Sequence, residues 1–516
     1  MNFKVLFKHK IMNIYLKRLL LVITGALTFN IVFWDEKLAL NAVLFDAVLL
    51  PSLLMLYPEA IKKRNVQVLL LGHLISLVAI LYQNTDLSKI TYFFTLFLLT
   101  AFVQYNHRSA WYAAGSYLFN FVFLPFSLYL DFRTILEGRK KKPMKSRLLR
   151  IMKLSVIPIA LLIIFIMFYT AANPVFSDLW NNLTYKLQRA LNYFFEIISF
   201  ARICFFLWGM YLTGSILERV QNQYFSKKDM VQEDVLQRIR KRHKDIFGEP
   251  LKNLALKNAN TIGVLSLTLL NGLLFVVNCI DIDFVWLHYS FDPNKPLYKL
   301  VHEGTEMLIL SIFCAIAILL IFFKGNLNFY KKNKWLKYGA YAWIIQNSIL
   351  VISVLLRDYY YIKYYGLAYK RIGVLVFLFM VLVGLITMFL KIYNRKSTYY
   401  LFRVNAWAGV CLLVIASCIH WDEMIARYNI RHAHEVTLDY AFLFSLSDKV
   451  LPTLEENRTT LFGNNPSDQG DWQGILRVRI RDFQTREQTY SWLSWNCSDA
   501  YVSNYLSKMN PAPVNR

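Results

Sequence analysis

The chain has 516 residues, of which 56% are hydrophobic and 16% aromatic, and its mean hydropathy is +0.36. This composition excludes an ordinary soluble protein and predicts a polytopic membrane protein. The formal net charge is +25. The excess Lys and Arg residues stand in short segments between apolar runs, so loop charge explains the excess and nucleic acid is not an expected partner. Membrane lipids are the expected partners.

Apolar runs recur along the whole chain. They stand at about 19–34, 38–57, 66–82, 90–105, 110–130, 154–172, 192–214, 260–280, 304–323, 338–356, 369–390 and 402–421. A helix needs roughly 20 residues to cross the hydrocarbon core, and the runs do not alternate as the strands of a membrane barrel do. The sequence therefore predicts an all-α transmembrane bundle of eleven or twelve spans.

The basic segment 131–153 fixes the expected topology, because cytoplasmic loops carry the excess of Lys and Arg. Seven spans follow it, and they place the small C-terminal tail, residues 422–516, outside the cytoplasm. The predicted organisation is N-terminal membrane helices (1–130), this basic loop, a membrane core (154–421) and the tail. The charge pattern before residue 131 fits four crossings better than five, so we expect the run 110–130 to be re-entrant or interfacial.

Three segments carry local predictions. Residues 218–252 resemble a cytoplasmic helical linker that stops at Gly248 and Pro250. In the tail, arginines alternate with apolar residues over 476–481, which predicts a short exposed strand. Asn173 precedes Pro174 and is expected to cap a helix.

The densest mixture of charged and aromatic residues lies between the apolar runs 338–356 and 369–390. A short connection, expected at 357–368, would hold Arg357 and Arg371 close together beside five tyrosines, with Asp358 as a counter-charge. Arginine binds phosphate or carboxylate through two parallel hydrogen bonds. The sequence thus suggests a pocket for an anionic lipid headgroup or substrate at the outer face. The alternative is that the arginines reach the membrane interface beside an ordinary aromatic belt.

Polar side chains also line up within predicted spans. Gln346, Ser353 and Arg357 fall close to one line on a helix, and Asn192, Glu196 and Ser199 form a second stripe. Such stripes face either a neighbouring helix or a water-filled cavity, and both interpretations stay open. The candidate substrate-binding residues are Gln346, Ser353, Arg357, Asp358, Tyr360, Tyr364 and Arg371.

Common catalytic motifs are missing from the sequence: it has no GxxxxGK(S/T), HExxH or GxSxG. His302, Glu303 and Glu306 form an HExxE in which His302 and Glu306 share a helical face, whereas a catalytic zinc normally has three protein ligands. These residues and Glu196 are secondary site candidates. The acids also suit a helix N-terminus, and we expect neither a metal nor a cofactor.

Several stretches resemble a bacterial family, domain of unknown function 4173, in a Bacteroidetes-like form. They are AANPVFSDLW at 171–180, the segments 302–337 and 343–374 that include LLRDYYYIKYYGLAYKR, and LDYAFLFSLSDKVLPTL in the tail. The resemblance implies a multi-pass membrane domain in bacteria, for which we expect the inner membrane as the location, and it implies no particular activity.

Three functions remain open on the sequence. Transport or permeation of a small or anionic solute would use a polar path through the bundle. A membrane-embedded enzyme for a lipid-linked or anionic substrate would use a one-sided pocket with a paired acid and base. A non-catalytic assembly or sensory subunit would need neither.

Overall fold

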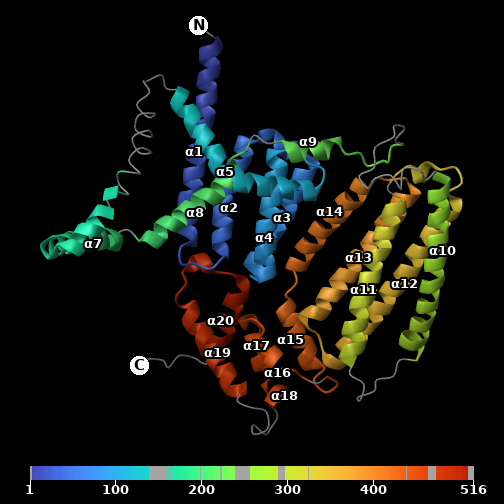
Figure 1. Cartoon of the computed structure of the whole chain (residues 1–516). Helices are drawn as coiled ribbons and strands as arrows, with labels where there is room; N and C mark the ends of the chain where they lie inside the picture. The colour runs from blue at the N-terminus through green and yellow to red at the C-terminus, as the bar shows by residue number, and fades with distance from the viewer. Residues whose placement is uncertain are drawn as a thin grey trace. The chain divides into compact units, whose positions relative to one another are not determined.

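The computed structural model describes residues 3–138, 158, 161–162, 164–197, 199–220, 223–238, 256–288, 297–323, 325–436, 438–462 and 472–509. Over these residues the chain is helical and contains no strand, which confirms the predicted all-α class (Figure 1). The strand predicted at 476–481 is wrong. These residues belong to α19 (Trp472–Glu487), where Leu476 and Phe483 are buried seven residues apart, at the helical period.

Eight helices in the described parts of the chain are long and apolar enough to cross a membrane. They are α1 (Phe3–Phe33), α3 (Arg64–Tyr82), α4 (Asp86–Gln104), α8 (Phe200–Leu217), α10 (Leu256–Asp281) with its π-helical extension η3 (Ile282–Leu287), α12 (Lys334–Tyr365), α13 (Tyr369–Tyr393) and α14 (Thr398–Ser417). Two apolar helices are shorter, namely α2 (Leu40–Leu56) and the Leu308–Phe322 part of α11 (Leu297–Phe322). The multi-pass prediction is therefore confirmed.

Two of the predicted runs differ from this set. The run 110–130 lies in α5 (Ala110–Gly138), a continuous helix with Pro125 inside it that is not one of the eight. The run 154–172 is not among the eight either, and seven of its 19 residues, 154–157, 159–160 and 163, lie outside the described residues. The interpretation that 110–130 does not cross the membrane stays a prediction.

The connections are more helical than the sequence suggested. Residues 174–191, which separate two of the predicted apolar runs, belong to α7 (Pro174–Ile197). Asn173 Oδ1 accepts hydrogen bonds from the backbone N–H groups of Val175 (3.0 Å) and Phe176 (3.3 Å). The predicted cap is thereby confirmed. In the linker 218–252 the structure contains α9 (Tyr224–Val231), whereas Gly248 and Pro250 lie outside the described residues. Two 3-10 turns, η1 (Pro58–Lys62) and η4 (Asn326–Phe329), precede α3 and α12.

The chain forms two compact units. Unit 1 comprises Met1–Glu36, Val43–Pro58 and Leu118–Asn222, and unit 2 comprises Lys37–Ala42, Glu59–Tyr117 and Gln223–Arg516. In unit 1, α1 packs against α8, and a Cβ atom on Gly209 would stand 2.5 Å from Phe29 Cδ1. Glycine therefore permits the close approach. Arg18 Nη1 and Glu218 Oε1, 3.1 Å apart, join the same two segments.

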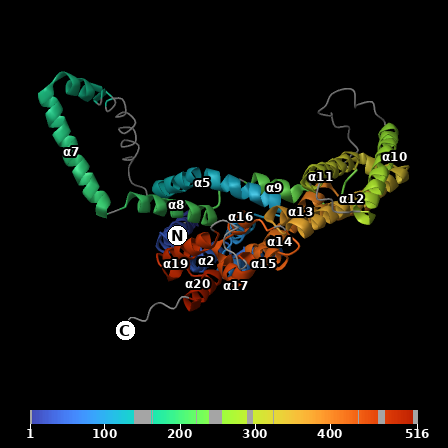
Figure 2. The same ribbon diagram turned by 90° about the horizontal axis from the view of Figure 1, so that it is seen from below.

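Unit 2 contains the helices that matter for the site. Helices α10, α11, α12 and α13 lie side by side in both ribbon views (Figures 1 and 2). Helix α14 contacts α13 as well as α3 and α4 (Figure 1). Buried residues such as Leu267, Leu319 and Met388 form their common core. Polar groups are paired across it: Lys391 Nζ donates to the carbonyl oxygen of Phe323 at 2.7 Å.

The tail forms a cluster of short helices on one end of unit 2. These are α15 (Trp421–Arg431), α16 (Tyr440–Leu443), η5 (Asp448–Val450), α17 (Leu451–Glu456), α18 (Arg458–Phe462), α19, η7 (Trp492–Ser494) and α20 (Cys497–Met509). Their core includes Ile362, Leu367 and Ile372 from the end of the α12–α13 hairpin together with Ile425 and Leu443. The tail therefore completes its hydrophobic core with membrane-helix residues.

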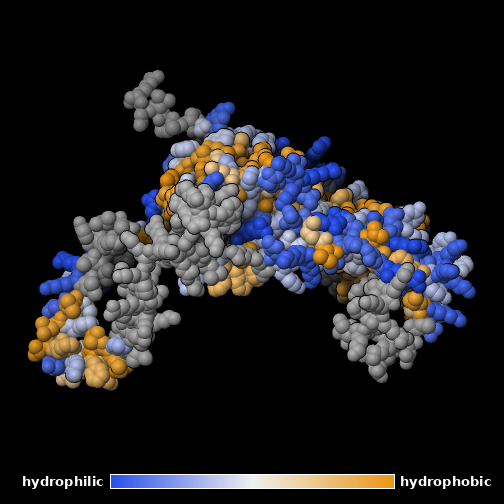
Figure 3. All heavy atoms as spheres, turned by 90° about the horizontal axis from the view of Figure 1, so that it is seen from above, coloured by the Kyte–Doolittle hydropathy of each residue, from blue (hydrophilic) through white to orange (hydrophobic). Residues whose placement is uncertain are grey.

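The two ends of unit 2 differ in character. At the end opposite the tail, η4, the start of α12 and the α13–α14 turn carry exposed Lys331, Lys332, Lys334 and Arg395. This end faces the viewer in Figure 3, where hydrophilic side chains gather on it. The placement of basic residues on one end agrees with the pattern from which the topology was predicted. Which end faces the cytoplasm stays a prediction.

Candidate functional site

A cavity of about 900 Å³ lies where the α12–α13 hairpin meets α15 and α16. We refer to it as the tyrosine cavity, because Tyr361, Tyr365 and Tyr369 line it. The walls also include Asp358, Lys370 and Arg371. A volume of this size lies within the range that small-molecule sites occupy.

The connection between α12 and α13 is only Gly366–Ala368, whereas the sequence suggested a loop over 357–368. The stretch 357–365 contains no Gly or Pro, and Gly366 ends the helix because its φ of +78° is a conformation that suits glycine. Asn429 of α15 holds the turn: its Oδ1 accepts from Leu367 N at 2.6 Å, and its Nδ2 donates to Leu367 O at 2.9 Å. The α12–α13 turn, which lines the cavity, is thus hydrogen-bonded to the tail helix α15.

Arg371 lies flat against one wall. Its Nη1 donates to the carbonyl oxygens of Tyr365 (2.8 Å) and Gly366, and its guanidinium carbon lies 4.2 Å from the ring centroid of Tyr361. A cation at the carbonyl end of α12 interacts favourably with the helix dipole, and stacking on an aromatic face adds to this. These contacts fix the positive charge at the cavity wall.

Asp358 supplies an acidic side chain to the same cavity. The residue is 2% exposed, and within the described structure its Oδ2 has no hydrogen-bond partner. A buried carboxylate oxygen without a donor costs free energy. The donor group of a bound molecule would remove that cost.

Most of the remaining wall is apolar. The apolar residues are Ile309, Leu367, Ala368, Val374, Val436, Leu438, Phe442 and Leu443, and Asn429 and the exposed Asp439 also line the cavity. The cavity thus joins one fixed cation, one buried acid and a hydrophobic surface, and this combination suits an amphipathic molecule.

The predicted polar stripe on α12 has a different environment. Gln346 Nε2 donates to Asn271 Oδ1 at 2.8 Å, and Ser353 Oγ accepts from the indole N–H of Trp286 at 3.0 Å. Arg357 Nη2 lies 2.5 Å from Asp281 Oδ1. All three partners belong to α10 or η3, so these contacts join helices. They fit the interhelical alternative rather than a cavity.

The structure therefore separates the two arginines. Arg371 lines the tyrosine cavity, whereas Arg357 points toward α10 and is not a lining residue. The two arginines are separated because α12 continues to Tyr365, so that Arg357 lies within the helix and not in a loop. At 100° per residue, Asp358, Tyr361 and Tyr365 share one face with spacings of three and four residues, and Arg357 lies on another.

Tyr360 and Tyr364 follow Arg357 at the same spacing and likewise do not line the cavity. The ring centroids of Tyr359 and Tyr360 are 5.8 Å apart, and Lys363 Nζ lies 5.7 Å from the ring centroid of Tyr364. If residues 357–365 are treated as a helix, the spacing of the tyrosines places Tyr361 and Tyr365 on one face and Tyr360 and Tyr364 on another. Asn429 and the α16 residues carry no local signal and were missed.

The secondary candidates are placed only by their backbone. His302, Glu303 and Glu306 lie in α11 and Glu196 lies in α7, but their side chains lie outside the described residues. Among the side chains that the structure describes, no group of three His, Cys, Asp or Glu residues is arranged to hold a metal ion.

The family model DUF4153, a domain of unknown function, matches residues 69–457. The chain belongs to this family, because the match covers most of its length and all walls of the tyrosine cavity. The resemblance to domain of unknown function 4173 is corrected accordingly, since that family is not the one matched. No curated protein and no solved structure matches the chain.

Proposed function

We propose that this member of the DUF4153 family binds an amphipathic molecule with an anionic, phosphate-like head in the tyrosine cavity, and acts on it at one face of the membrane. The observation that supports the proposal is the meeting of Arg371, Asp358 and an apolar wall in one cavity. The sequence had suggested the same class of ligand from this stretch.

In this proposal Arg371 and Lys370 hold the anionic head. The hydrogen bonds to the α12 carbonyls use Nη1 of Arg371, so Nε and Nη2 remain to donate to the ligand. A guanidinium presents its donors in a planar fork that matches two oxygens of a phosphate. Lys370 is exposed at the rim and adds a second positive charge.

Asp358 is proposed to contact a hydroxyl or amine of the same head group through Oδ2. The hydrophobic chain of the ligand lies against residues such as Leu438 and Phe442. A carboxyl group beside a bound phosphate ester is also positioned to move a proton, which is what general acid–base catalysis requires. This pairing favours a membrane-embedded enzyme among the three functions considered.

A transport function has less support. It rested on the stripe of Gln346, Ser353 and Arg357, and the contacts of these residues run to α10 and η3. A non-catalytic binding subunit would share the ligand and differ only in lacking turnover.

The test is equilibrium binding of a fluorescent phosphatidic acid analogue to the full chain in lipid nanodiscs of neutral phosphatidylcholine. We expect Lys370→Ala to weaken binding about tenfold, which is ~1.4 kcal/mol. Lys363→Ala is the matched control, because Lys363 is exposed at the same end of the α12–α13 hairpin and does not line the cavity. Equal weakening by Lys363→Ala and Lys370→Ala would show attraction to general surface charge and would refute the proposal.

A further inference from the structure

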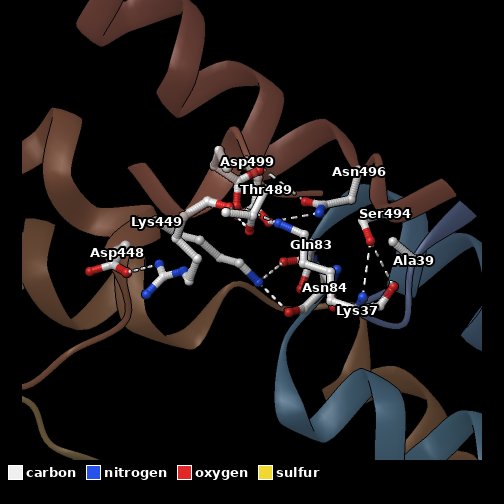
Figure 4. Close-up of polar contacts among 12 residues, drawn as sticks. Lys37, Ala39, Gln83, Asn84, Asp448, Lys449, Thr489, Ser494, Asn496 and Asp499 are labelled. Atoms are coloured by element: carbon white, nitrogen blue, oxygen red, sulfur yellow. Dashed lines mark hydrogen bonds and ion pairs between the residues drawn. The ribbon is translucent and has the colours of Figure 1, made fainter. Parts of the chain in front are cut away.

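A second cavity, of about 540 Å³, lies within unit 2 beside the tail helices. We refer to it as the polar cavity. Its walls come from the segment around Lys37, the α3–α4 turn, the start of α15, η5, α19 and α20. Figure 4 shows the hydrogen bonds and ion pairs that hold part of this region together.

Lys37 joins the tail helices on one side of the polar cavity. Its Nζ lies 2.5 Å from Glu487 Oε1 and 2.7 Å from Asp499 Oδ2. Asp499 also accepts from Asn496 Nδ2 at 2.8 Å. Burial by itself lowers the pKa of Lys37, but the hydrogen bonds to Asp499 and Glu487 raise it above its ordinary value. Lys37 is therefore held in its charged form.

Lys449 holds the opposite side. Its Nζ donates to the carbonyl oxygens of Gln83 and Asn84, which follow the last turn of α3 (Figure 4). A cation there satisfies carbonyls that the helix leaves without donors. Burial lowers the pKa of Lys449 to about 8.

The charges on the wall nearly cancel. Four cationic residues, Lys37, Lys89, Lys449 and Arg486, face five acidic ones, Asp86, Asp422, Asp448, Glu487 and Asp499. Several are already paired; Asp448, for example, lies 2.5 Å from Arg486 and 2.7 Å from Arg479. The wall therefore offers hydrogen-bond donors and acceptors without a net field that would select an ion.

The side chain of Asn84 indicates which kind of ligand group would fit the polar cavity, namely a hydrogen-bond donor. It lines the polar cavity, it is 5% exposed, and its Oδ1 has no hydrogen-bond partner among the described residues. A buried acceptor without a donor is costly, so a bound molecule that donates to it gains affinity. Trp421, Tyr369 and Phe483 add aromatic rings to the same wall. Aromatic rings with balanced donors and acceptors suit a neutral group that carries many hydroxyls.

Tyr369 lines both cavities. It stands at the first position of α13, directly before Lys370 and Arg371. The two cavities therefore share a wall residue that directly precedes the proposed phosphate-binding pair, Lys370 and Arg371. This shared residue makes the polar cavity a neighbour of the proposed phosphate site.

We infer that the amphiphile carries a polyhydroxylated, sugar-like group on its phosphate, and that this group occupies the polar cavity. The inference rests on the proposed function and names its substrate class as a lipid phosphate linked to a saccharide. Asn84 and Trp421 contact the saccharide, Lys370 and Arg371 contact the phosphate, and the α16 wall contacts the chain.

The test uses two competitors of the fluorescent phosphatidic acid analogue, with the full chain in nanodiscs: dodecyl phosphate, and dodecyl phosphate esterified to glucose. We expect the glucose-bearing competitor to bind the parent about tenfold more tightly than dodecyl phosphate. The decisive variant is Asn84→Gly. Because Asn84 has φ +49°, glycine keeps the backbone conformation while the side chain is lost.

Asn84→Gly is expected to abolish the preference for the glucose-bearing competitor and to leave dodecyl phosphate binding unchanged. Arg395→Gly is the matched control, because Arg395 has φ +51° and lines neither cavity, and it should retain the preference. If the parent shows no preference, or Asn84→Gly retains it, the inference fails while dodecyl phosphate binding still supports the proposed function. If neither competitor binds, the proposed function itself fails.

Discussion

Arg357 on α12 and Asp281 on α10 form an ion pair of 2.5 Å between residues that lie 76 positions apart, and both side chains are about nine-tenths buried. Removing one member of a buried pair leaves an uncompensated charge, at a cost of about 3–5 kcal/mol, whereas replacing both by apolar residues is often neutral. We therefore expect Arg357→Leu to lower the unfolding temperature strongly and Arg357→Leu with Asp281→Leu to restore most of it. A double variant as unstable as the single one would show that the pairing is not what matters.

The second prediction concerns the effect of replacing Gly366 on stability and on ligand binding. A Cβ atom there would stand 2.5 Å from Asn429 Oδ1, and the φ of +78° is unfavourable for other residues. Gly366→Ala should destabilise the chain by more than 1 kcal/mol, roughly, and weaken ligand binding in the tyrosine cavity. Gly373→Ala is the control, because nothing lies within 4 Å of its Cβ position in α13. Thermal unfolding and phosphatidic acid binding are measured for both, and equal behaviour of the two variants contradicts the prediction.

The third prediction concerns how the contribution of Asp229 to folding stability depends on pH. This fully buried carboxylate accepts from the backbone N–H groups of Arg108 (2.7 Å) and Ser109 (3.2 Å) and from Tyr399 Oη (2.6 Å), and His107 Nδ1 lies 3.1 Å away. Burial alone raises the pKa of Asp229, but the hydrogen bonds from His107, Tyr399 and the backbone lower it below 3.8.

Because the folded-state pKa is the lower one, the carboxylate stabilises the fold above about pH 4, and this contribution is lost as the pH falls through the folded pKa. Asp229→Asn should cost about 1–3 kcal/mol at neutral pH and progressively less below pH 4. Unfolding temperatures of parent and variant across this range check the prediction. A difference that stays constant with pH contradicts it.

The membrane topology gives a further prediction. Seven spans are expected after the basic segment 131–153, so a reporter that is active only in the cytoplasm should be silent when fused after Arg516. The same reporter inserted between Lys62 and Arg64 should be active. Activity after Arg516 would reverse the predicted orientation, and silence at the second position would restore a fifth N-terminal crossing.

The helical class and the multi-pass character could be read from sequence, because the cost of placing a residue in hydrocarbon depends mainly on that residue and its neighbours along the chain. The same holds for Asn173, whose capping bonds reach only two and three residues ahead. The stretch around Asp358 and Arg371 stood out for the same local reason, as a concentration of charge and tyrosine between apolar runs.

Only the tertiary structure decided where these side chains face. Arg357 and Asp358 are adjacent in sequence, yet one pairs with α10 and the other lines the tyrosine cavity, because one residue of helix turns the side chain by 100°. The partners Asp281 and Asn429 lie 76 and 62 positions from the residues that they bind. Such contacts depend on which helices pack together, and no local pattern of residues encodes that choice.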